Sequence, residues 1–229
     1  MNRFAKKTLR RIKRIMVGVL GSKTDELYWE FRHIFDKSWA KSYISDSSVN
    51  NSHRDFLINR ISNFYPFNSI LEFGCASGPN LYLLAKKFPN IEIYGIDISS
   101  NAIEEGKEYF ESKNIKNVFL SAGRGIEVLK NFKDKSIDLV FTDAVLIYSG
   151  INKIEDVIKE ILRVANKGIV FLELHHSLPL SVYKDNWIHN YQILLEKYIN
   201  KEKIKINRIP KGIWKGNWAD SGHIIEVRF

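Results

Sequence analysis

One segment decides the fold: Ile70-Leu71-Glu72-Phe73-Gly74-Cys75-Ala76-Ser77-Gly78-Pro79-Asn80. It joins a short apolar run, typical of a buried strand, to a helix with proline in its first turn. The small residues between them allow a ligand to approach the backbone at the carboxyl end of the strand. Free backbone N–H groups at the start of the helix favour an anionic group. The segment therefore predicts a strand–turn–helix unit that binds a nucleotide-like ligand.

Two carboxylates narrow the nature of that ligand. Glu72 lies two residues before Gly74, where an acid suits a ligand with a cationic amino group. Asp97 ends the next predicted strand, and an acid at this place in a strand–helix–strand unit hydrogen-bonds ribose hydroxyls. The alternative for Asp97 is a helix N-cap or a turn residue. The two acids around one glycine turn predict a nucleoside ligand that carries an amine.

The nicotinamide-binding pattern G-x-G-x-x-G fails in this segment. Counted from Gly74, its second glycine is replaced by Ala76 and its third by Pro79. Proline cannot supply the torsional freedom of a glycine where the helix packs on the strand. The sequence therefore disfavours a nicotinamide oxidoreductase.

The rest of the chain predicts an α/β fold in which strands alternate with helices. We expect helices at 51–64, 79–88, 102–113, 154–165 and 187–199, and strands at 69–73, 91–97, 118–121, 137–143, 169–174, 204–209 and 223–229. Alternation of this kind predicts a parallel sheet with helices on both faces. No helical pattern separates the last two strands, which predicts a hairpin and an antiparallel final strand. The expected divisions are a basic helix or arm at 1–21, a helical lead-in at 22–66 and the ligand-binding domain at 67–229.

Cysteine content and hydropathy bear on location. Cys75 is the only cysteine, so an intrachain disulfide is impossible and a reducing, cytoplasmic interior is expected. No apolar run is long enough to span a bilayer; 15–20 is far too short, and no signal-peptide cleavage pattern follows it.

The net charge of +9 is concentrated near the amino terminus. Seven basic residues lie within 3–14, and removing them leaves +2 for the rest of the chain. Residues 3–20 have apolar residues at roughly helical spacing, and such a basic amphipathic helix can lie on an anionic membrane at the cytoplasmic face. The alternatives are a solvated arm or a helix docked on the body or on a partner subunit. A nearly neutral body disfavours a groove that follows nucleic-acid phosphates without excluding it.

The segments 71–80 and 95–98 resemble class I methyltransferases, and the resemblance extends over about 60–229. It implies a Rossmann-like, doubly wound, mostly parallel seven-stranded sheet with an antiparallel C-terminal hairpin strand, and S-adenosylmethionine as cofactor. It also implies that Glu72 orders the methionine amino group or a supporting water network. Gly74, Ala76 and Gly78 would then line the methionine and ribose, and Asp97 would hold the ribose hydroxyls. No metal is expected.

The cofactor-binding residues expected from this resemblance are Glu72, Gly74, Cys75, Ala76, Gly78, Asn80, Asp97, Ile98, Ala122, Gly123 and Asp143. The chain departs from the family pattern twice. Ala76 replaces the middle glycine, which should be tolerated if its torsions are ordinary. An acid that often contacts adenine at the end of the third strand is missing, and residues 122–124 read Ala-Gly-Arg.

A general base is needed only for a hydroxyl or protonated-amine acceptor. The candidate catalytic residues are Asp143, which ends the fourth strand, and His175, which follows the fifth. The unperturbed pKa of histidine suits a base near neutral pH. The alternative for His175 is a polar residue whose hydrogen bonds are already satisfied.

The acceptor is expected to be a small molecule or a glycan precursor. The arrangement of 39–43, 53–54, 143–146, 187–191 and 214–218 is similar to uncharacterised microbial methyltransferases, some of them near glycan-assembly genes. Trp214 and Trp218 lie in the loop of the terminal hairpin, and aromatic loop residues often bind ligands. The alternatives are an RNA or protein methyltransferase anchored by the basic arm, and a non-catalytic cofactor-binding protein. The fourth strand is followed by Asp143-Ala144-Val145-Leu146, without the Pro-Pro-aromatic run of many nucleic-acid amino-methylating enzymes.

Overall fold

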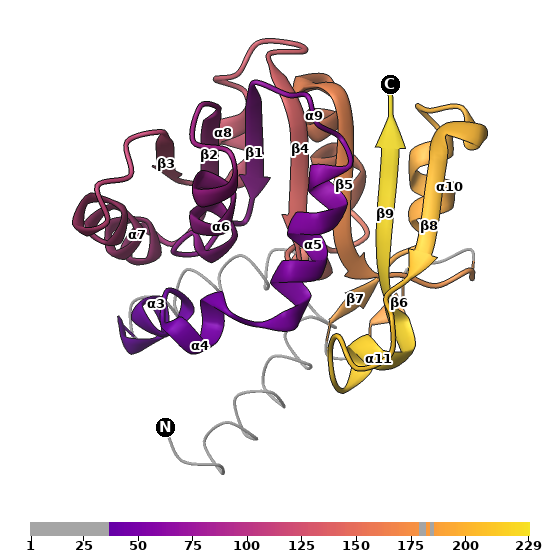
Figure 1. The fold of residues 1–229 in the computed structure, drawn as a ribbon. Helices are drawn as coiled ribbons and strands as arrows, with labels where there is room; N and C mark the ends of the chain where they lie inside the picture. Colours follow the sequence, from indigo (N-terminus) through magenta and orange to yellow (C-terminus); the bar gives the residue numbers. More distant parts are fainter. Residues whose placement is uncertain (1–36, 179–181, 184–185) are drawn as a thin grey trace.

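A single seven-stranded sheet forms the centre of the computed structural model, which describes residues 37–178, 182–183 and 186–229 (Figure 1). The strand order is β3-β2-β1-β4-β5-β9-β8. The strands are β1 (Ser69–Phe73), β2 (Glu92–Asp97), β3 (Val118–Ala122), β4 (Ile137–Asp143), β5 (Ala165–Leu174), β8 (Ile204–Arg208) and β9 (Gly222–Arg228). β1 to β5 are parallel, and β9 runs antiparallel to both β5 and β8. The expected seven-stranded α/β fold with an antiparallel C-terminal hairpin is confirmed.

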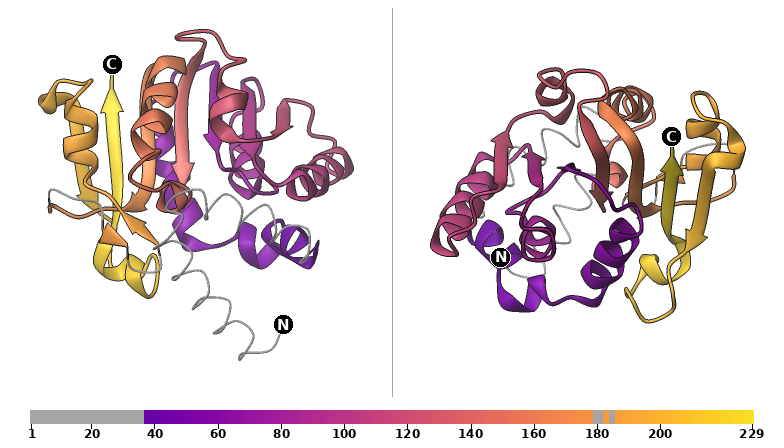
Figure 2. Two further views of the ribbon diagram at one scale, coloured as in Figure 1. Left: turned by 180° about the vertical axis from the view of Figure 1, so that it is seen from behind. Right: turned by 45° about the horizontal axis from the view of Figure 1, so that its top comes forward.

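Helices cover both faces of this sheet, as its two further views show (Figure 2). α5, α6 and α7 lie on one face, and α8, α9 and α10 on the other, while α3 and α4 lie near the carboxyl ends of the parallel strands. Their bounds are α3 (Lys37–Tyr43), α4 (Asp46–Val49), α5 (Ser52–Ser62), α6 (Pro79–Lys87), α7 (Ser100–Ser112), α8 (Gly125–Leu129), α9 (Ile154–Val164), α10 (Tyr191–Glu196) and α11 (Asn217–Ser221). Two 3-10 turns, η1 (Leu146–Tyr148) and η2 (Lys201–Lys203), and a short hairpin of β6 (Val182–Tyr183) and β7 (Trp187–Ile188) complete the described elements.

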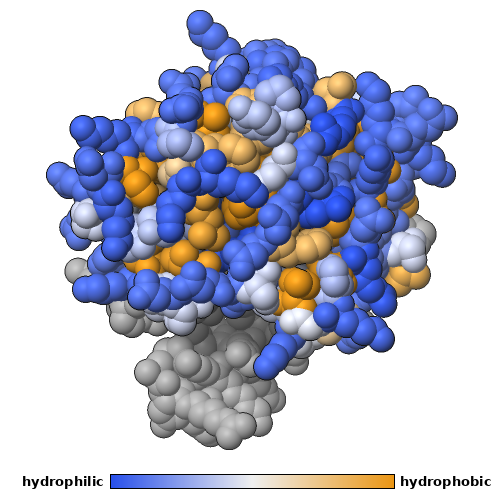
Figure 3. Space-filling view, viewed as in Figure 1, coloured by the Kyte–Doolittle hydropathy of each residue, from blue (hydrophilic) through white to orange (hydrophobic). Residues whose placement is uncertain are grey.

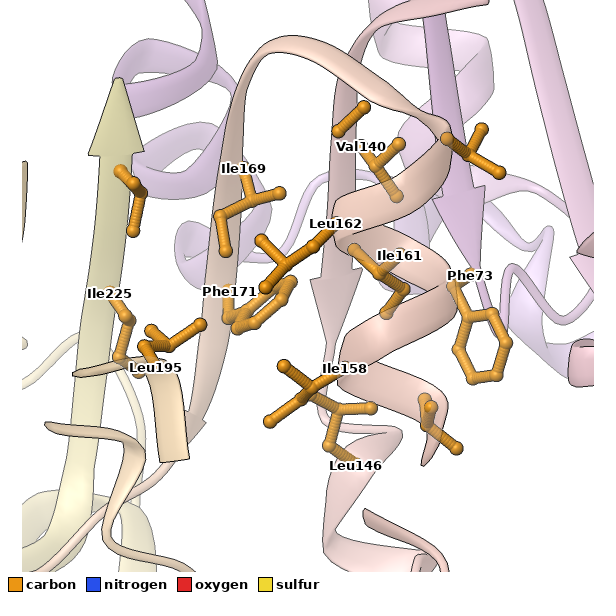
Figure 4. Close-up of a cluster of buried hydrophobic side chains, with 14 of the residues drawn as sticks. Phe73, Val140, Leu146, Ile158, Ile161, Leu162, Ile169, Phe171, Leu195 and Ile225 are labelled. Carbon is orange, nitrogen blue, oxygen red and sulfur yellow. The ribbon is translucent and has the colours of Figure 1, made fainter. Parts of the chain in front are cut away.

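The core has two layers because strand side chains alternate between the faces of the sheet. Within β4, Val140 belongs to the layer under α9, whereas Leu139 and Phe141 belong to the layer under α5 and α6. α9 contributes Ile158 and Ile161, one turn apart, to the first layer, where they pack with Phe171 of β5 (Figure 4). These three side chains are completely buried. The apolar residues at helical spacing on α9 therefore pack against the inward-facing residues of the strands in one apolar layer.

The strand order places a crevice at the carboxyl end of β1. The chain moves from β1 outward to β2 and β3, and later returns to β4 on the other side of β1. Ligands bind at such a reversal of strand order in open α/β sheets. In register, Glu72 lies beside Gly95 of β2 and Phe141 of β4, so Asp97 and Asp143 end their strands at the same edge. The sheet alone brings the three acids together.

The structure differs from the sequence prediction at the C-terminal connections. The helix expected at 187–199 begins only at Tyr191, because Trp187 and Ile188 pair with β6 and Asn190 caps the helix through its side chain. The loop expected to carry Trp218 contains the short helix α11, and α8 was not predicted. Pairing with a neighbouring strand outweighed the helical pattern at 187–188.

The predicted basic helix at 3–20 lies outside the described residues. In the described part of the chain, no helix is both long and apolar enough to span a bilayer. The expected divisions at residues 21 and 66 stay predictions.

Replacing Ile158 by alanine should test the α9 layer. The side chain is fully buried between α9 and the sheet, so its removal leaves a cavity. We expect a loss of about 2–5 kcal/mol in the free energy of unfolding, measured by urea denaturation. Lys159→Ala, an exposed change on the same helix, should cost about 0.5 kcal/mol or less. Equal losses in the two variants would contradict the assigned packing.

Candidate functional site

A cavity of about 700 Å³ lies at the carboxyl ends of β1, β2 and β4. Of the expected cofactor-binding residues, it is lined by Glu72, Gly74, Cys75, Ala76, Asn80, Asp97, Ile98 and Asp143. Gly78, Ala122 and Gly123 are not among the lining residues. Beyond the third strand the wall is formed by 124–127, at the start of α8. The structure thus brings most of the expected residues to one cavity, and residues 124–127 line it in place of Ala122 and Gly123.

The turn after β1 is held in left-handed backbone conformations. Gly74 has φ of 80° and Gly78 of 82°, and a Cβ on Gly74 would collide with the side chain of Val145. Ala76 has φ of 50°, so the condition under which this alanine would be tolerated without cost, ordinary torsions, is not met. A left-handed alanine costs roughly 1 kcal/mol relative to glycine. The turn keeps this geometry because neighbouring groups fix it.

Asp97 is one of those groups. Its Oδ2 accepts a hydrogen bond from the backbone N–H of Ala76 at 2.8 Å, and its Oδ1 accepts one from Ser99 N–H at 2.8 Å. Burial raises the pKa of Asp97, and the two amides act against that rise. Each oxygen retains further acceptor capacity. Ser99 is the N-cap of α7, so Asp97 has the role of the turn residue and not of the cap. This role is compatible with the predicted ribose ligand, because the carboxylate also lines the cavity.

Asn80 connects the other two acids of the site. Its Nδ2 donates to Glu72 Oε1 at 2.6 Å and to Asp143 Oδ2 at 2.9 Å. Its Oδ1 accepts from Arg54 Nη1 at 3.0 Å, and the same nitrogen donates to Asp143 Oδ2 at 3.1 Å. Within the described residues, Glu72 Oε2 and Asp143 Oδ1 have no hydrogen-bond partner. Two buried acceptor atoms at the cavity wall thus remain for a ligand with several donors.

The pKa values of Glu72 and Asp143 are shifted in opposite directions. Burial raises the pKa of Glu72 to about 8, against the effect of its hydrogen bond from Asn80. Burial also acts to raise the pKa of Asp143, but His53, Arg54 and Asn80 outweigh it and hold that pKa below its usual value. The site near neutral pH therefore holds an ionised Asp143 beside a largely protonated Glu72. An ammonium group at the site would favour ionisation of Glu72.

An aromatic stack forms another wall of the cavity. The ring of His53 stacks on Trp214 at 4.0 Å, and Trp214 stacks on Trp218 at 4.1 Å between ring centroids. His53 Nε2 lies 3.4 Å from Asp143 Oδ2, and its Nδ1 lies 2.8 Å from Asn51 Oδ1. Both ring nitrogens thus face oxygen atoms. Side chains from α5 and from the β8–β9 connection meet at this wall.

The loop after β4 is fixed at both ends by buried side chains. Glu173 Oε1 accepts hydrogen bonds from the backbone N–H groups of Val145 and Leu146, each at 3.0 Å. At the other end, His189 Nε2 donates to the carbonyl oxygen of Ser149 at 2.9 Å. The loop lines the cavity and places Val145 against Gly74. Glu173 therefore acts on the site through the loop.

His175 lies outside the residues that line the cavity. Its Nδ1 accepts a hydrogen bond from the backbone N–H of Tyr191 at 3.2 Å, and its ring lies 4.9 Å from that of His223. Burial, with the neighbouring His223 and His176, lowers the pKa of His175 to about 4. The geometry therefore supports the satisfied polar residue rather than the predicted general base.

Some residues of the site have only a weak signal in the sequence. His53 and Arg54 belong to a segment that is similar to uncharacterised methyltransferases, but nothing in their spacing shows that α5 packs over the carboxyl end of β1. Asn51, two residues before His53, is the N-cap of α5 and accepts from His53 N–H, which is a recognisable helix start. Arg124 follows the third strand, where the family often has an acid, and it lines the cavity.

A family model described as a methyltransferase domain matches residues 68–218. The chain belongs to this methyltransferase-domain family. An uncharacterised protein of Rickettsia prowazekii (strain Madrid E) is 33% identical over 115 residues, which cover 48% of this chain and 43% of that protein. Malonyl-(acyl-carrier protein) O-methyltransferase of Priestia megaterium is 42% identical over 71 residues, 30% of this chain and 26% of that enzyme. The chain spans about half or less of the length of these curated relatives.

Solved structures confirm the class I methyltransferase fold. A SAM-dependent methyltransferase from Aquifex aeolicus matches with a TM-score of 0.57 at 16% identity, covering 84% of this chain and 97% of that one. The magnesium protoporphyrin IX methyltransferase of Synechocystis, solved with bound SAM, gives 0.58 at 18% identity and covers 96% of each chain. The family and fold expected from the glycine turn are confirmed, and S-adenosylmethionine is the cofactor of this class.

The raised pKa values predict that stability falls with rising pH. Glu72 and Glu173 both have a pKa of about 8, raised by burial from 4.5. The folded protein therefore binds more protons than the unfolded chain between these values, and the stability contributed below pH 4.5 is lost as pH rises through about 8. The slope is at most about 1.4 kcal/mol per pH unit for each group. Urea denaturation of wild type and Glu72→Gln/Glu173→Gln at several pH values should show this loss only in the wild type; parallel curves would contradict it.

Removing the Glu173 side chain should release the loop after β4. Glu173→Ala leaves two buried N–H groups without an acceptor, at roughly 1–3 kcal/mol each. Glu173→Gln keeps an accepting oxygen and should remain within about 1 kcal/mol of wild type. Amide hydrogen exchange of Val145 and Leu146 should accelerate in the alanine variant only. The same protection in both variants would remove Glu173 from this role.

Proposed function

We propose that this protein transfers a methyl group from S-adenosylmethionine to an oxygen or nitrogen atom of an acceptor. One observation carries the proposal: Glu72 and Asp97 flank a left-handed small-residue turn at the same cavity. A nucleoside with a ribose diol and an amino group needs acceptors at two separated points. The chain presents both points, together with unpartnered acceptor oxygens on Glu72 and Asp143.

The residues of the cavity fit the cofactor. Asp97 offers its remaining acceptor capacity to the ribose hydroxyls, and Glu72 and Asp143 offer acceptors to the amino group. Arg54 supports this end by fixing Asn80 and Asp143. Residues 124–127 of the cavity wall lie beyond β3 and would contact adenine.

The cofactor supplies an electrophilic methyl group, and the protein's task is to align the acceptor atom. Asp143 is a poor proton acceptor, because His53, Arg54 and Asn80 hold its pKa below the usual value. We therefore assign Asp143 to orienting Arg54, His53 and Asn80 rather than to taking a proton. His175, outside the cavity lining, has no assigned role in proton transfer.

The half of the cavity beside the aromatic stack would hold the acceptor. His53, Trp214 and Trp218 give this half an apolar wall, while Tyr148, Ser149 and Asn186 supply polar groups. The small-molecule or glycan-precursor acceptor expected from the sequence stays a prediction. The named relatives differ in acceptor, since one is a malonyl-(acyl-carrier protein) enzyme and another a tRNA (guanine-N7) methyltransferase of Oceanobacillus iheyensis, 25% identical over 111 residues. RNA is a second candidate, favoured by the surface charge described below.

Calorimetry with S-adenosylmethionine and S-adenosylhomocysteine tests the proposal. Both should bind, and NADH should not. Asp97→Asn removes a charged acceptor of the diol and should weaken binding about tenfold to a hundredfold. His175→Ala should bind normally and turn over normally once an acceptor is found. Failure of wild-type protein to bind either sulfur nucleoside would refute the proposal.

A further inference from the structure

Charge is unevenly distributed over the body of this protein. Residues 197–215 contain seven lysines and arginines and one acid, Glu202, which is a net charge of +6. Apart from this segment and residues 3–14, the chain carries a net charge of −4. The value of +2 for the body as a whole therefore hides a basic segment within an acidic remainder.

The basic residues lie along one edge of the sheet. They are Lys197, Lys201, Lys203, Lys205, Arg208, Lys211 and Lys215, all exposed. Only Lys197 has an ion pair among the described residues, with Glu155. We call the other six the β8 strip. Figure 3 shows a largely hydrophilic surface on the side where β8 lies in Figure 1.

The strip leads toward the cavity. β8 forms the edge of the sheet and runs in the direction of the parallel strands, because it is antiparallel to β9 and β9 is antiparallel to β5. Arg208 therefore lies at the cavity end, paired with His223. The chain continues through Lys211 to Trp214 and Lys215, and Trp214 lines the cavity. Four of the six cations lie on β8 and on the turn η2 that precedes it. The other two, Lys211 and Lys215, lie on either side of Trp214 in the sequence.

Edge strands often carry lysines simply to prevent pairing with other chains. That role needs one or two charges on the strand itself. Here unpaired cations precede β8, occupy it and follow it to the cavity. Cations concentrated along one edge next to aromatic rings combine the two features with which proteins bind single-stranded nucleic acid, positive charge for the phosphates and rings for the bases. A flat membrane would instead require cations spread over a face.

We propose that the β8 strip binds the phosphate backbone of single-stranded RNA and guides it toward the aromatic wall of the cavity. The assignment of this RNA as the methyl acceptor rests on the proposed function, whereas its binding to the strip does not. The net charge of +2 disfavours nucleic-acid binding only when it is averaged over the whole body. At the edge of the sheet the same charge is concentrated on β8 and on the segments directly before and after it.

Fluorescence anisotropy with labelled oligouridine and the full-length chain tests the proposal. The variant Lys203→Glu/Lys205→Glu/Arg208→Glu should bind at least about tenfold more weakly at low salt. Its slope of log affinity against log salt should be shallower by about 2, because each phosphate contact contributes roughly 0.7. The milder triple variant with glutamine at these positions should lie between this variant and the wild type. Thermal unfolding checks that the exposed substitutions leave the fold intact.

The matched control is Lys107→Glu/Lys113→Glu/Lys116→Glu, with the same total charge change at the opposite side of the sheet, beside β3. It should retain most of the affinity, and residues 3–14 are common to all variants. Equal losses in the two triple variants, or none in either, overturn the proposal.

Poly-glutamate and vesicles with anionic phosphatidylglycerol are tested in parallel. If either binds through the strip as strongly as oligouridine does, the partner is an acidic protein or a membrane and the RNA assignment is wrong. Calorimetry with S-adenosylmethionine on the same samples separates the two claims. If the wild type binds the cofactor and the β8-strip variant keeps its RNA affinity, only the RNA-binding role of the strip is refuted. If the wild type does not bind the cofactor, only the proposed function is refuted.

Discussion

The site depends on the side chain of one asparagine, Asn80, at the start of α6. Its amide nitrogen donates to both Glu72 and Asp143, and its oxygen accepts from Arg54. Two buried carboxylates repel each other unless donors lie between them. Asn80 provides those donors without adding a charge, and its hydrogen bonds act to lower the pKa of both acids against the effect of burial. The three elements that carry these residues, β1, β4 and α5, are thereby joined at the cavity.

The close approach of two loops imposes a second constraint. Val145 packs on the bare Cα of Gly74, and the two amides that hold Val145 and Leu146 in place are bound by Glu173 of β5. Glu173 thus holds the loop that follows the neighbouring strand β4, and through Val145 this loop contacts the turn after β1, two strands away. A residue that touches no ligand therefore helps to determine the width of the cavity.

The sequence predicted the sheet and the acids at its carboxyl edge well, because periodicity and a turn of small residues are local signals. Glu72, Asp97 and Asp143 could be placed from strand ends alone. His53 could not be assigned to the site in this way, since its contact with Trp214 joins positions far apart in the chain. The torsion of Ala76 and the distance of His175 from the cavity likewise depend on tertiary hydrogen bonds. The basic edge was concealed for a related reason: net charge is a sum, and only the fold shows where its parts lie.

The position of β9 has a consequence for how the molecule is made. β9 lies between β5 and β8 although it follows both in the chain. A nascent chain leaving the ribosome must therefore keep the outer edge of β5 unpaired until residues 222–228 emerge. β8 cannot dock before then, and the tryptophans of the cavity wall stay unanchored. The nucleotide-binding half can form during translation, but the complete cavity must await the synthesis of β9.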